Sequence, residues 1–320
     1  MRYTHDKPYP RRGLMTAVCT VGMYMVAAII GYGTVLANSL PFDVSSKSAI
    51  VVDASTGEII VGKNEEYIRP IASITKLMTA VVILDAQLPM NESVTITHDD
   101  AKHTTLRGRP YSTSLPVGTT LTRRELLHLA LMNSHNRAAA ALGRSYPGGM
   151  SAFVSAMNDK AQALGMYDTH FVEPTGLLSN NVSTAKDLAV LVHHAASYAE
   201  IQELSTSTKL VARIKNQEAA FGTTNRFLTQ QGWVIGVQKT GYISRAGWCL
   251  VMITYVADSS FIVVLLNTQS AYDRAADAIK VKHWIETGTV VSSTDVRLLN
   301  PYQVQQKRHI KTQCKNKHAR

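Results

Sequence analysis

Residues 72–79 read ASITKLMT, which places a serine and a lysine, Ser73 and Lys76, three positions apart at the start of an apolar run. Pro70 precedes this run and predicts the start of a helix. On a helix, side chains three positions apart lie on one face and can form a hydrogen bond. A lysine that is kept neutral could then take the serine proton and create a nucleophile. The S-x-x-K pattern alone also arises by chance, so it needs support from elsewhere in the chain.

Two further motifs supply that support in a fixed order. Ser134-His135-Asn136 is an S-x-N pattern at a predicted break between helices. Lys239-Thr240-Gly241 is a K-T-G pattern in a predicted strand. Three ordered motifs are far less expected by chance than one, and they predict a single active site.

Apolar periodicity and turn residues predict strands at both ends of the chain and helices between them. Residues 49–52 and 59–61 flank the turn-rich 53–57 and predict a β-hairpin. Three more apolar runs predict antiparallel strands joined by short connections: 233–239, 248–256 and 261–266. Between the two strand regions, helices are predicted from 70, 123, 138, 152 and 184, and a last helix spans 275–287. The predicted fold class is α+β, with an antiparallel sheet built from both chain ends and a helical region between.

The excess of positive charge lies at the ends of the chain. The 320 residues carry a formal net charge of +10, yet the first 37 account for +3 and the residues from Pro301 onward for +6. The nearly neutral middle, with 45% apolar residues over the whole chain, is typical of a globular protein that can bury a full core. A nucleic-acid partner is therefore not expected.

The amino-terminal segment predicts export. Arg11-Arg12 precedes a long uncharged run, and Val35-Leu36-Ala37 has small residues where signal peptidases cleave. We interpret residues 1–37 as a signal peptide, with an uncleaved anchor through residues 14–36 as the alternative. A linker over 38–47 and a domain over 48–290 follow.

The carboxyl-terminal segment, residues 291–320, is predicted to be a basic, solvated tail. An anionic membrane surface or a wall polymer is one possible target, and docking on a partner or no binding at all are the alternatives. Cys249 is expected to be buried in a strand, and a bridge to Cys314 in the tail is disfavoured. No cysteine or histidine spacing suggests a metal site, and no cofactor is expected.

With these residues in view, the chain resembles the low-molecular-mass penicillin-binding proteins, which are serine DD-peptidases with a β-lactamase/transpeptidase-like fold. The resemblance covers about residues 48–287 and includes 133–139 (NSHNRAA), 171–177 (FVEPTGL) and 238–242 (QKTGY). An Asn-Arg pair after Ser134 and a tyrosine after the K-T-G place it nearest the D-alanyl-D-alanine endopeptidases. His135 departs from that pattern, because this position is usually acidic there.

The resemblance implies a role for each motif residue. Ser73 would be the nucleophile and Lys76 the base, its pKa depressed by burial and by the like charge of Lys239. Ser134 would relay a proton to the leaving amine, and Asn136 would bind the substrate amide or Lys76. The substrate would also be bound by Lys239, Thr240 and Gly241. The oxyanion hole would consist of the backbone N–H groups of Ser73 and Tyr242. No metal is implied.

Other polar residues near these motifs are interpreted as structural. Glu173 lacks the context of a deacylating glutamate, so β-lactams are expected to act as covalent inhibitors. His135 is expected to be an exposed turn residue. Ser179-Asn180-Asn181 is rejected as a second S-x-N motif, because it lies in a predicted loop.

The predicted function is an exported, periplasmic serine endopeptidase that cleaves D-alanyl cross-bridges between peptidoglycan stem peptides through an acyl-enzyme on Ser73. A D-alanyl-D-alanine carboxypeptidase is the nearest alternative. A penicillin-acylated scaffold or sensor with little turnover is an alternative of another class.

Overall fold

The computed structural model describes residues 41–102, 105–106, 109–110 and 115–302. The predicted signal peptide or anchor, Cys314 and most of the predicted tail lie outside these residues. Among the described helices, none is both long and apolar enough to cross a membrane.

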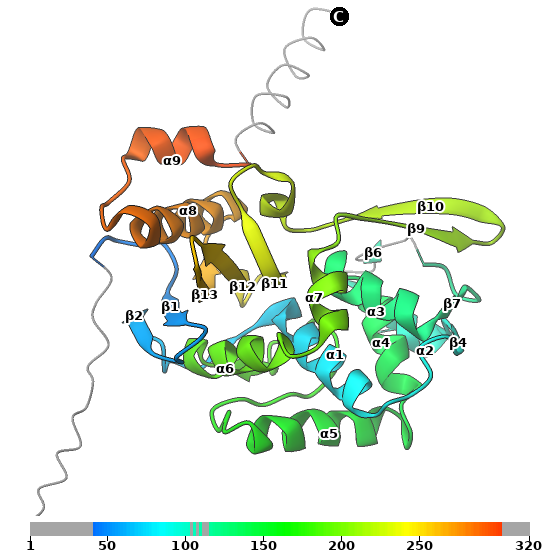
Figure 1. Ribbon diagram of the computed structural model, residues 1–320. Helices are drawn as coiled ribbons and strands as arrows, with labels where there is room; N and C mark the ends of the chain where they lie inside the picture. The colour runs from blue at the N-terminus through cyan, green and yellow to red at the C-terminus, as the bar shows by residue number, and fades with distance from the viewer. Residues whose placement is uncertain (1–40, 103–104, 107–108, 111–114, 303–320) are drawn as a thin grey trace, which may run out of the picture. The chain divides into compact units, whose positions relative to one another are not determined.

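A five-stranded antiparallel sheet joins the two ends of the domain, as predicted (Figure 1). The spatial order is β11-β12-β13-β1-β2. The amino-terminal hairpin consists of β1 (Ser48–Asp53) and β2 (Ile59–Lys63), and β1 also pairs with β13. The three carboxyl-terminal strands are β11 (Val234–Ile243), β12 (Gly247–Val256) and β13 (Ser259–Thr268). The predicted α+β class is confirmed.

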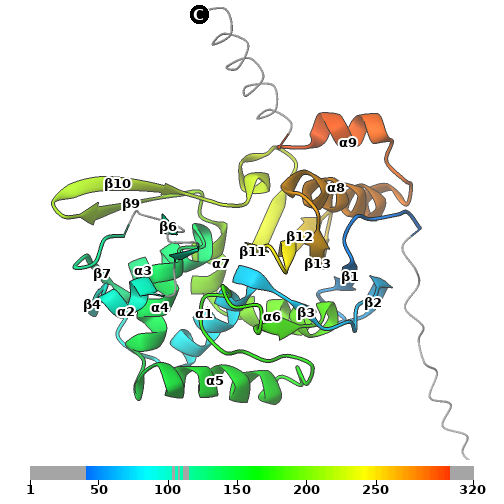
Figure 2. The ribbon, with the colours of Figure 1, turned by 180° about the vertical axis from the view of Figure 1, so that it is seen from behind.

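Both faces of this sheet are buried, which explains its continuous apolar runs. Because successive side chains of a strand point to opposite faces, Ala49 and Val51 pack with α8 (Ala271–Thr287) in one apolar cluster. Ile50 and Val52 belong to a second cluster, which includes α6 (Ala185–Ala195) and the other helices of the central region. Figures 1 and 2 show α8 and α6 on opposite faces of the sheet.

The helical region contains the helices that the periodicity predicts, with shifted ends. They are α1 (Thr75–Asp85), α3 (Arg123–Met132), α4 (Asn136–Arg144) and α5 (Gly149–Ala163). The predicted capping box at the start of α3 is confirmed, since Thr122 and Glu125 exchange hydrogen bonds. The helix start at Pro70 is wrong: Pro70 lies in β3 (Arg69–Pro70), and a 3₁₀ turn, η1 (Ala72–Ile74), precedes α1. Ala72 has φ +48°, which an α-helix does not allow.

Several elements were not predicted from the sequence. Between α6 and β11 lie α7 (Ala199–Thr206), a hairpin of β9 (Lys209–Ile214) and β10 (Gln217–Gly222), and the 3₁₀ turn η2 (Arg226–Thr229). Lys215 and Asn216 both have positive φ, as a tight hairpin turn requires. The remaining short elements are β4 (Ser93–Thr95), α2 (His98–Lys102), β5 (Thr105–Leu106), β6 (Arg109–Pro110), β7 (Thr120–Thr122) and β8 (Val182–Ser183).

Two predicted boundaries are wrong, because flanking residues belong to the folded domain. In the predicted linker, Val44 and Ser46 are buried, and Ser46 donates two hydrogen bonds to the buried carboxylate of Asp277 on α8. In the predicted tail, residues 293–299 form the helix α9 (Ser293–Leu299), whose Val296 packs into the cluster under α8. A few apolar side chains among polar ones suffice to attach both segments.

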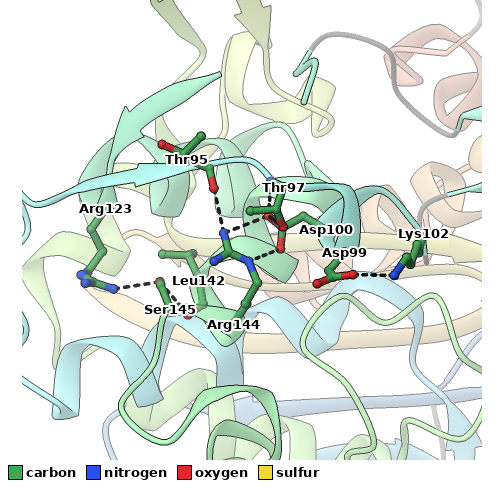
Figure 3. Close-up of polar contacts among 9 residues, drawn as sticks. All are labelled: Thr95, Thr97, Asp99, Asp100, Lys102, Arg123, Leu142, Arg144 and Ser145. Carbon is green, nitrogen blue, oxygen red and sulfur yellow. Dashed lines mark hydrogen bonds and ion pairs between the residues drawn. The ribbon is translucent and has the colours of Figure 1, made fainter. Parts of the chain in front are cut away.

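An ion pair between Arg144 and a buried carboxylate fixes the carboxyl-terminal end of α4 (Figure 3). The carboxylate of Asp100, 1% exposed, accepts hydrogen bonds from Arg144 Nε at 2.9 Å and Nη2 at 3.0 Å. The same carboxylate accepts from the backbone N–H and hydroxyl of Thr97, and Arg144 also donates to the carbonyl of Thr95. These bonds hold α4, which carries Asn136 at its other end, against α2 and β4.

Candidate active site

Ser73 lies in the 3₁₀ turn η1, and Lys76 lies in the first turn of α1. The distance from Lys76 Nζ to Ser73 Oγ is 2.9 Å, so the predicted serine–lysine pair is in direct contact. The left-handed conformation of Ala72, sparsely populated for a residue with a side chain, precedes Ser73. Backbone strain of this kind is typical of functional sites.

The Lys76 amine has three polar partners, and their chemistry orients it. Nζ lies 2.8 Å from Asn136 Oδ1 and 2.5 Å from the carbonyl oxygen of Thr175. A neutral amine has two N–H donors and one lone pair, and both of these oxygens can only accept. Since they take both hydrogens, the lone pair faces the hydroxyl of Ser73, which can donate to it. This arrangement is the one that a general base requires.

Burial favours the neutral amine. Lys76 is completely buried, and burial lowers its pKa from 10.5 to about 7, although the negative charge of Glu173 acts in the opposite direction. The predicted cause was partly different, because burial and not the like charge of Lys239 dominates. At neutral pH a large fraction of Lys76 is therefore able to accept a proton.

The S-x-N motif lies at the break between α3 and α4. Ser134 has φ +61°, which turns the chain between the two helices and lets Asn136 begin α4 with its side chain on Lys76. The N-cap position belongs to His135, so the Asn136 side chain is not the cap of this helix. The Ser134 hydroxyl forms no hydrogen bond with the described residues and borders the same cavity as Ser73.

His135 is not the exposed turn residue that the sequence predicted. Its side chain is 1% exposed and packs edge-to-face against Phe221 of β10, at 6.3 Å between ring centroids. The unpredicted β9–β10 hairpin supplies this cover. Burial, together with the positive charges of Lys76 and Arg137, lowers the His135 pKa to about 3. The imidazole is therefore neutral throughout the physiological pH range.

The K-T-G motif lies on β11, beside the turn that holds Ser73. A Cβ atom on Gly241 would lie 3.1 Å from the backbone nitrogen of Ser73, so glycine permits the close approach of this strand. Thr240 faces the cavity, and its hydroxyl is 2.6 Å from that of Thr224. Tyr242 stacks on Trp248 of β12, at 4.3 Å between ring centroids.

Lys239 does not reach the cavity. It is completely buried, and its Nζ donates to the backbone carbonyl of Thr240 at 2.9 Å. Burial first, then the positive charges of Lys76 and Arg274, lower its pKa well below the usual value. Lys239 therefore acts on the site from behind the strand, not through a surface that faces the cavity.

A cavity of about 560 Å³ brings the motif residues together. From the predicted site it is lined by Ser73, Ser134, Asn136, Thr240, Gly241 and Tyr242. Leu177 comes from the passage 171–177, and segments that no motif identified supply Thr224, Arg226, Trp248, Arg274 and Tyr302. The predicted residues therefore gather in one place, except that Lys76 and Lys239 lie behind its wall.

Arg274 of α8 is a charged lining residue that sequence reasoning missed. It is 3% exposed, and it makes no ion pair with any residue that the structure describes. Its Nη1 donates to the carbonyl of Cys249 at 3.3 Å, whereas its Nε has no partner within the described part of the chain. A buried cation without a counterion is costly unless a ligand supplies the charge. A single arginine inside an ordinary helix pattern gave no signal for this position.

The Glu173 loop is structural, as predicted. The two carboxylate oxygens accept from the backbone N–H groups of Thr175 at 2.5 Å and Gly176 at 2.7 Å. Asn181, from the rejected S-x-N pattern, also donates hydrogen bonds to the carbonyl and the carboxylate of Glu173 and so stabilises the loop. A Cβ on Gly176 would lie 1.9 Å from the carbonyl oxygen of Ala72, so the loop packs directly on the turn before Ser73. This loop presents the Thr175 carbonyl to Lys76.

Together, the fold and the contact between Ser73 and the buried Lys76 define a penicillin-binding serine peptidase. The family described as D-alanyl-D-alanine carboxypeptidase matches residues 34–270, and the chain belongs to this family of serine D-Ala-D-Ala peptidases.

Known proteins similar to this chain include peptidases and a transpeptidase. The D-alanyl-D-alanine endopeptidase of Pseudomonas aeruginosa is 44% identical over 252 residues, which cover 78% of this chain and 80% of that protein. The D-alanyl-D-alanine endopeptidase of Escherichia coli is 42% identical over 251 residues, with the same coverage. The crystal structure of the Streptomyces K15 DD-transpeptidase has a TM-score of 0.70 and 25% identity, covering 76% of this chain and 97% of that one.

Proposed function

We propose that this protein is a serine DD-endopeptidase that cleaves D-alanyl cross-bridges between peptidoglycan stem peptides. The observation that carries the acyl-transfer chemistry is the orientation of the buried Lys76 amine toward Ser73. The choice of an endopeptidase is supported by two relatives of that name at 44% and 42% identity. The Asn-Arg pair after Ser134 and the tyrosine after the K-T-G support the same choice.

The first half of the reaction forms an acyl-enzyme. Ser73 Oγ gives its proton to Lys76 Nζ and bonds to the carbonyl carbon of the D-alanyl residue. The backbone N–H groups of Ser73 and Tyr242 stabilise the resulting oxyanion, which is supported by the proximity of β11 to the Ser73 nitrogen. The C–N bond then breaks, and the proton reaches the leaving amine through Ser134, which lines the cavity together with Ser73. Water later hydrolyses the ester and returns Ser73 to its free form.

Substrate recognition divides between polar and cationic groups. Asn136 and Thr240 line the cavity and can bind the peptide backbone. We assigned Lys239 to substrate binding from the sequence, and its burial supports an indirect, electrostatic contribution instead. Arg274 is a cation that lines the cavity and has no counterion among the described residues, and we propose that it receives a carboxylate of the substrate.

Purified protein incubated with cross-linked muropeptide dimers and with monomeric pentapeptides tests this proposal. An endopeptidase converts the dimers to monomers, and mass spectrometry identifies the products. Release of free D-alanine from pentapeptides with intact dimers would instead show a carboxypeptidase, the activity in the family's description. Labelling by a fluorescent penicillin with neither hydrolysis would show a scaffold or sensor. The matched control is Ser73→Ala, which should lose both labelling and hydrolysis.

Export and the role of the tail stay predictions. Residues 1–37 support export by a signal peptide into the periplasm, with anchoring through 14–36 as the alternative. The six basic residues from Lys307 to Arg320, without an acid among them, support contact with an anionic membrane or wall polymer. Sedimentation with isolated sacculi or with anionic vesicles, with and without residues 303–320, tests the second prediction.

A further inference from the structure

The described chain ends at the active-site cavity. After α9, residues 300–302 return toward the sheet, and the side chain of Tyr302 lines the same cavity as Ser73. Asn300 is 3% exposed and donates from its side chain to the carbonyl of Tyr272 at 3.0 Å, which fixes this return. No motif marks these residues, and they lie in the segment that the sequence predicted to be a tail.

Tyr302 contacts both arginines of the cavity wall. Its hydroxyl accepts a hydrogen bond from Arg274 Nη2 at 2.8 Å. The Arg226 guanidinium lies over the Tyr302 ring, 4.7 Å from its centroid, and Arg226 also donates to the carbonyl of Pro301 at 3.4 Å. One aromatic side chain thus holds two cations in fixed positions through a hydrogen bond and a cation–π contact.

The Tyr302 hydroxyl is also linked by hydrogen bonds to β11, the strand that carries the K-T-G motif. It donates to the carbonyl of Thr224 at 3.4 Å, and the Thr224 hydroxyl is 2.6 Å from that of Thr240. Thr240 was assigned to substrate binding from the sequence. Tyr302 is therefore connected to both groups that are suited to an anion, the Arg274 guanidinium and the Thr240 hydroxyl.

We propose that Tyr302 is a positioning residue for recognition of the substrate's carboxylate, acting through Arg274. This inference rests on the proposed acylation of Ser73 and adds the carboxyl-terminal segment to the active site. Arg274 donates hydrogen bonds to only two groups among the described residues, the carbonyl of Cys249 and the Tyr302 hydroxyl. Without the hydrogen bond to Tyr302, the Arg274 guanidinium is no longer held in one orientation by Nη2. Binding of a carboxylate must then also order the guanidinium, which weakens the binding.

The test compares two probes that differ in one charge. Benzylpenicillin carries a carboxylate, and its methyl ester does not, whereas both acylate a serine through the same β-lactam carbonyl. In the full-length protein, Tyr302→Phe removes the hydroxyl and keeps the ring. We expect the second-order acylation constant for benzylpenicillin to fall about tenfold, because a hydrogen bond to a charged group is lost. The loss should lie in the dissociation constant of the non-covalent complex, with the acylation rate at saturation within twofold.

The ester and two variants separate positioning from packing. Acylation by the methyl ester should stay within twofold of wild type, and Tyr302→Phe should have no further effect when added to Arg274→Leu. The matched control is Tyr167→Phe, the same change at a tyrosine that is 75% exposed and does not line the cavity. Equal losses with both probes, or no loss with benzylpenicillin, would overturn the inference. Wild-type protein that neither probe labels would instead refute the proposed function itself.

Discussion

Two groups of ionisable side chains in this protein differ in whether each member has a partner of opposite charge. At the end of α4, Asp100 and Arg144 form a paired and hydrogen-bonded cluster (Figure 3). In the active site, Lys76, Lys239 and Arg274 are all buried, and none forms an ion pair with any described residue. The pKa values of both lysines are lowered, mainly by burial.

The contrast separates charges that hold the fold from charges that are kept for chemistry. Substitution of one member of a buried ion pair lowers the stability of the fold, because the other member stays buried without a counterion. Unpaired buried cations cost stability and remain only where a ligand or a proton transfer uses them. Substitutions in the two groups should therefore affect different quantities.

The largest expected effect is on acylation in Lys76→Met. This change removes the base and should lower the rate of penicillin acylation by about 10³-fold, within the range for general base catalysis. The free energy of unfolding should not fall at pH 7. The unfolded lysine binds a proton up to its usual pKa of 10.5 and the folded one only up to about 7, so wild-type stability should rise between these pH values. Thermal unfolding of both proteins from pH 7 to 10 checks this, and an equal rise in Lys76→Met would contradict it.

At the Asp100–Arg144 pair, the expected effect of a substitution is on the stability of the fold. Arg144→Met leaves the Asp100 carboxylate buried without its counterion and should lower the free energy of unfolding by about 3 kcal/mol, the lower end for a broken buried pair. The matched control is Arg124→Met, which breaks an exposed pair with Glu203 and should cost less than about 1 kcal/mol. Urea unfolding measures both. Similar losses in the two variants would remove the distinction between the paired cluster and a surface ion pair.

A smaller effect is expected at Glu173, whose charge raises the pKa of Lys76. Glu173→Gln should move the acidic limb of the acylation profile to lower pH, because the neutral amine becomes more favoured. If the substitution instead loosened the loop and admitted water to Lys76, the pKa would rise toward its usual value. The direction of the shift in a pH–rate profile distinguishes these outcomes, and an upward shift would show that the bracing role of Glu173 exceeds its electrostatic one.

The features that were predicted correctly from the sequence are those that depend on residues close together in the chain. The apolar run of β1, the capping box of Thr122 and Glu125, and the spacing of Ser73 and Lys76 all follow from neighbouring residues. Ordered motifs also predicted that Asn136 and Thr240 would join one cavity.

What the sequence missed depends on packing between distant segments. His135 is buried because Phe221 of a distant hairpin covers it. Arg274 and Tyr302 reach the cavity because α8 packs on β12 and the segment after α9 contacts α8, and neither residue has a local signature. Lys239 was expected to face the substrate, but its side chain bonds to the backbone of its own strand.

The central claim is that a neutral, buried Lys76 activates Ser73, and the pH dependence of Ser73 acylation by benzylpenicillin tests it most directly. The second-order rate constant, measured from pH 5 to 10 with mass-spectrometric proof that the adduct is on Ser73, should rise with an inflection near pH 7 and then level off. A rate constant that still rises toward pH 10 would mean that Lys76 keeps its ordinary pKa, and it would contradict this account of the site.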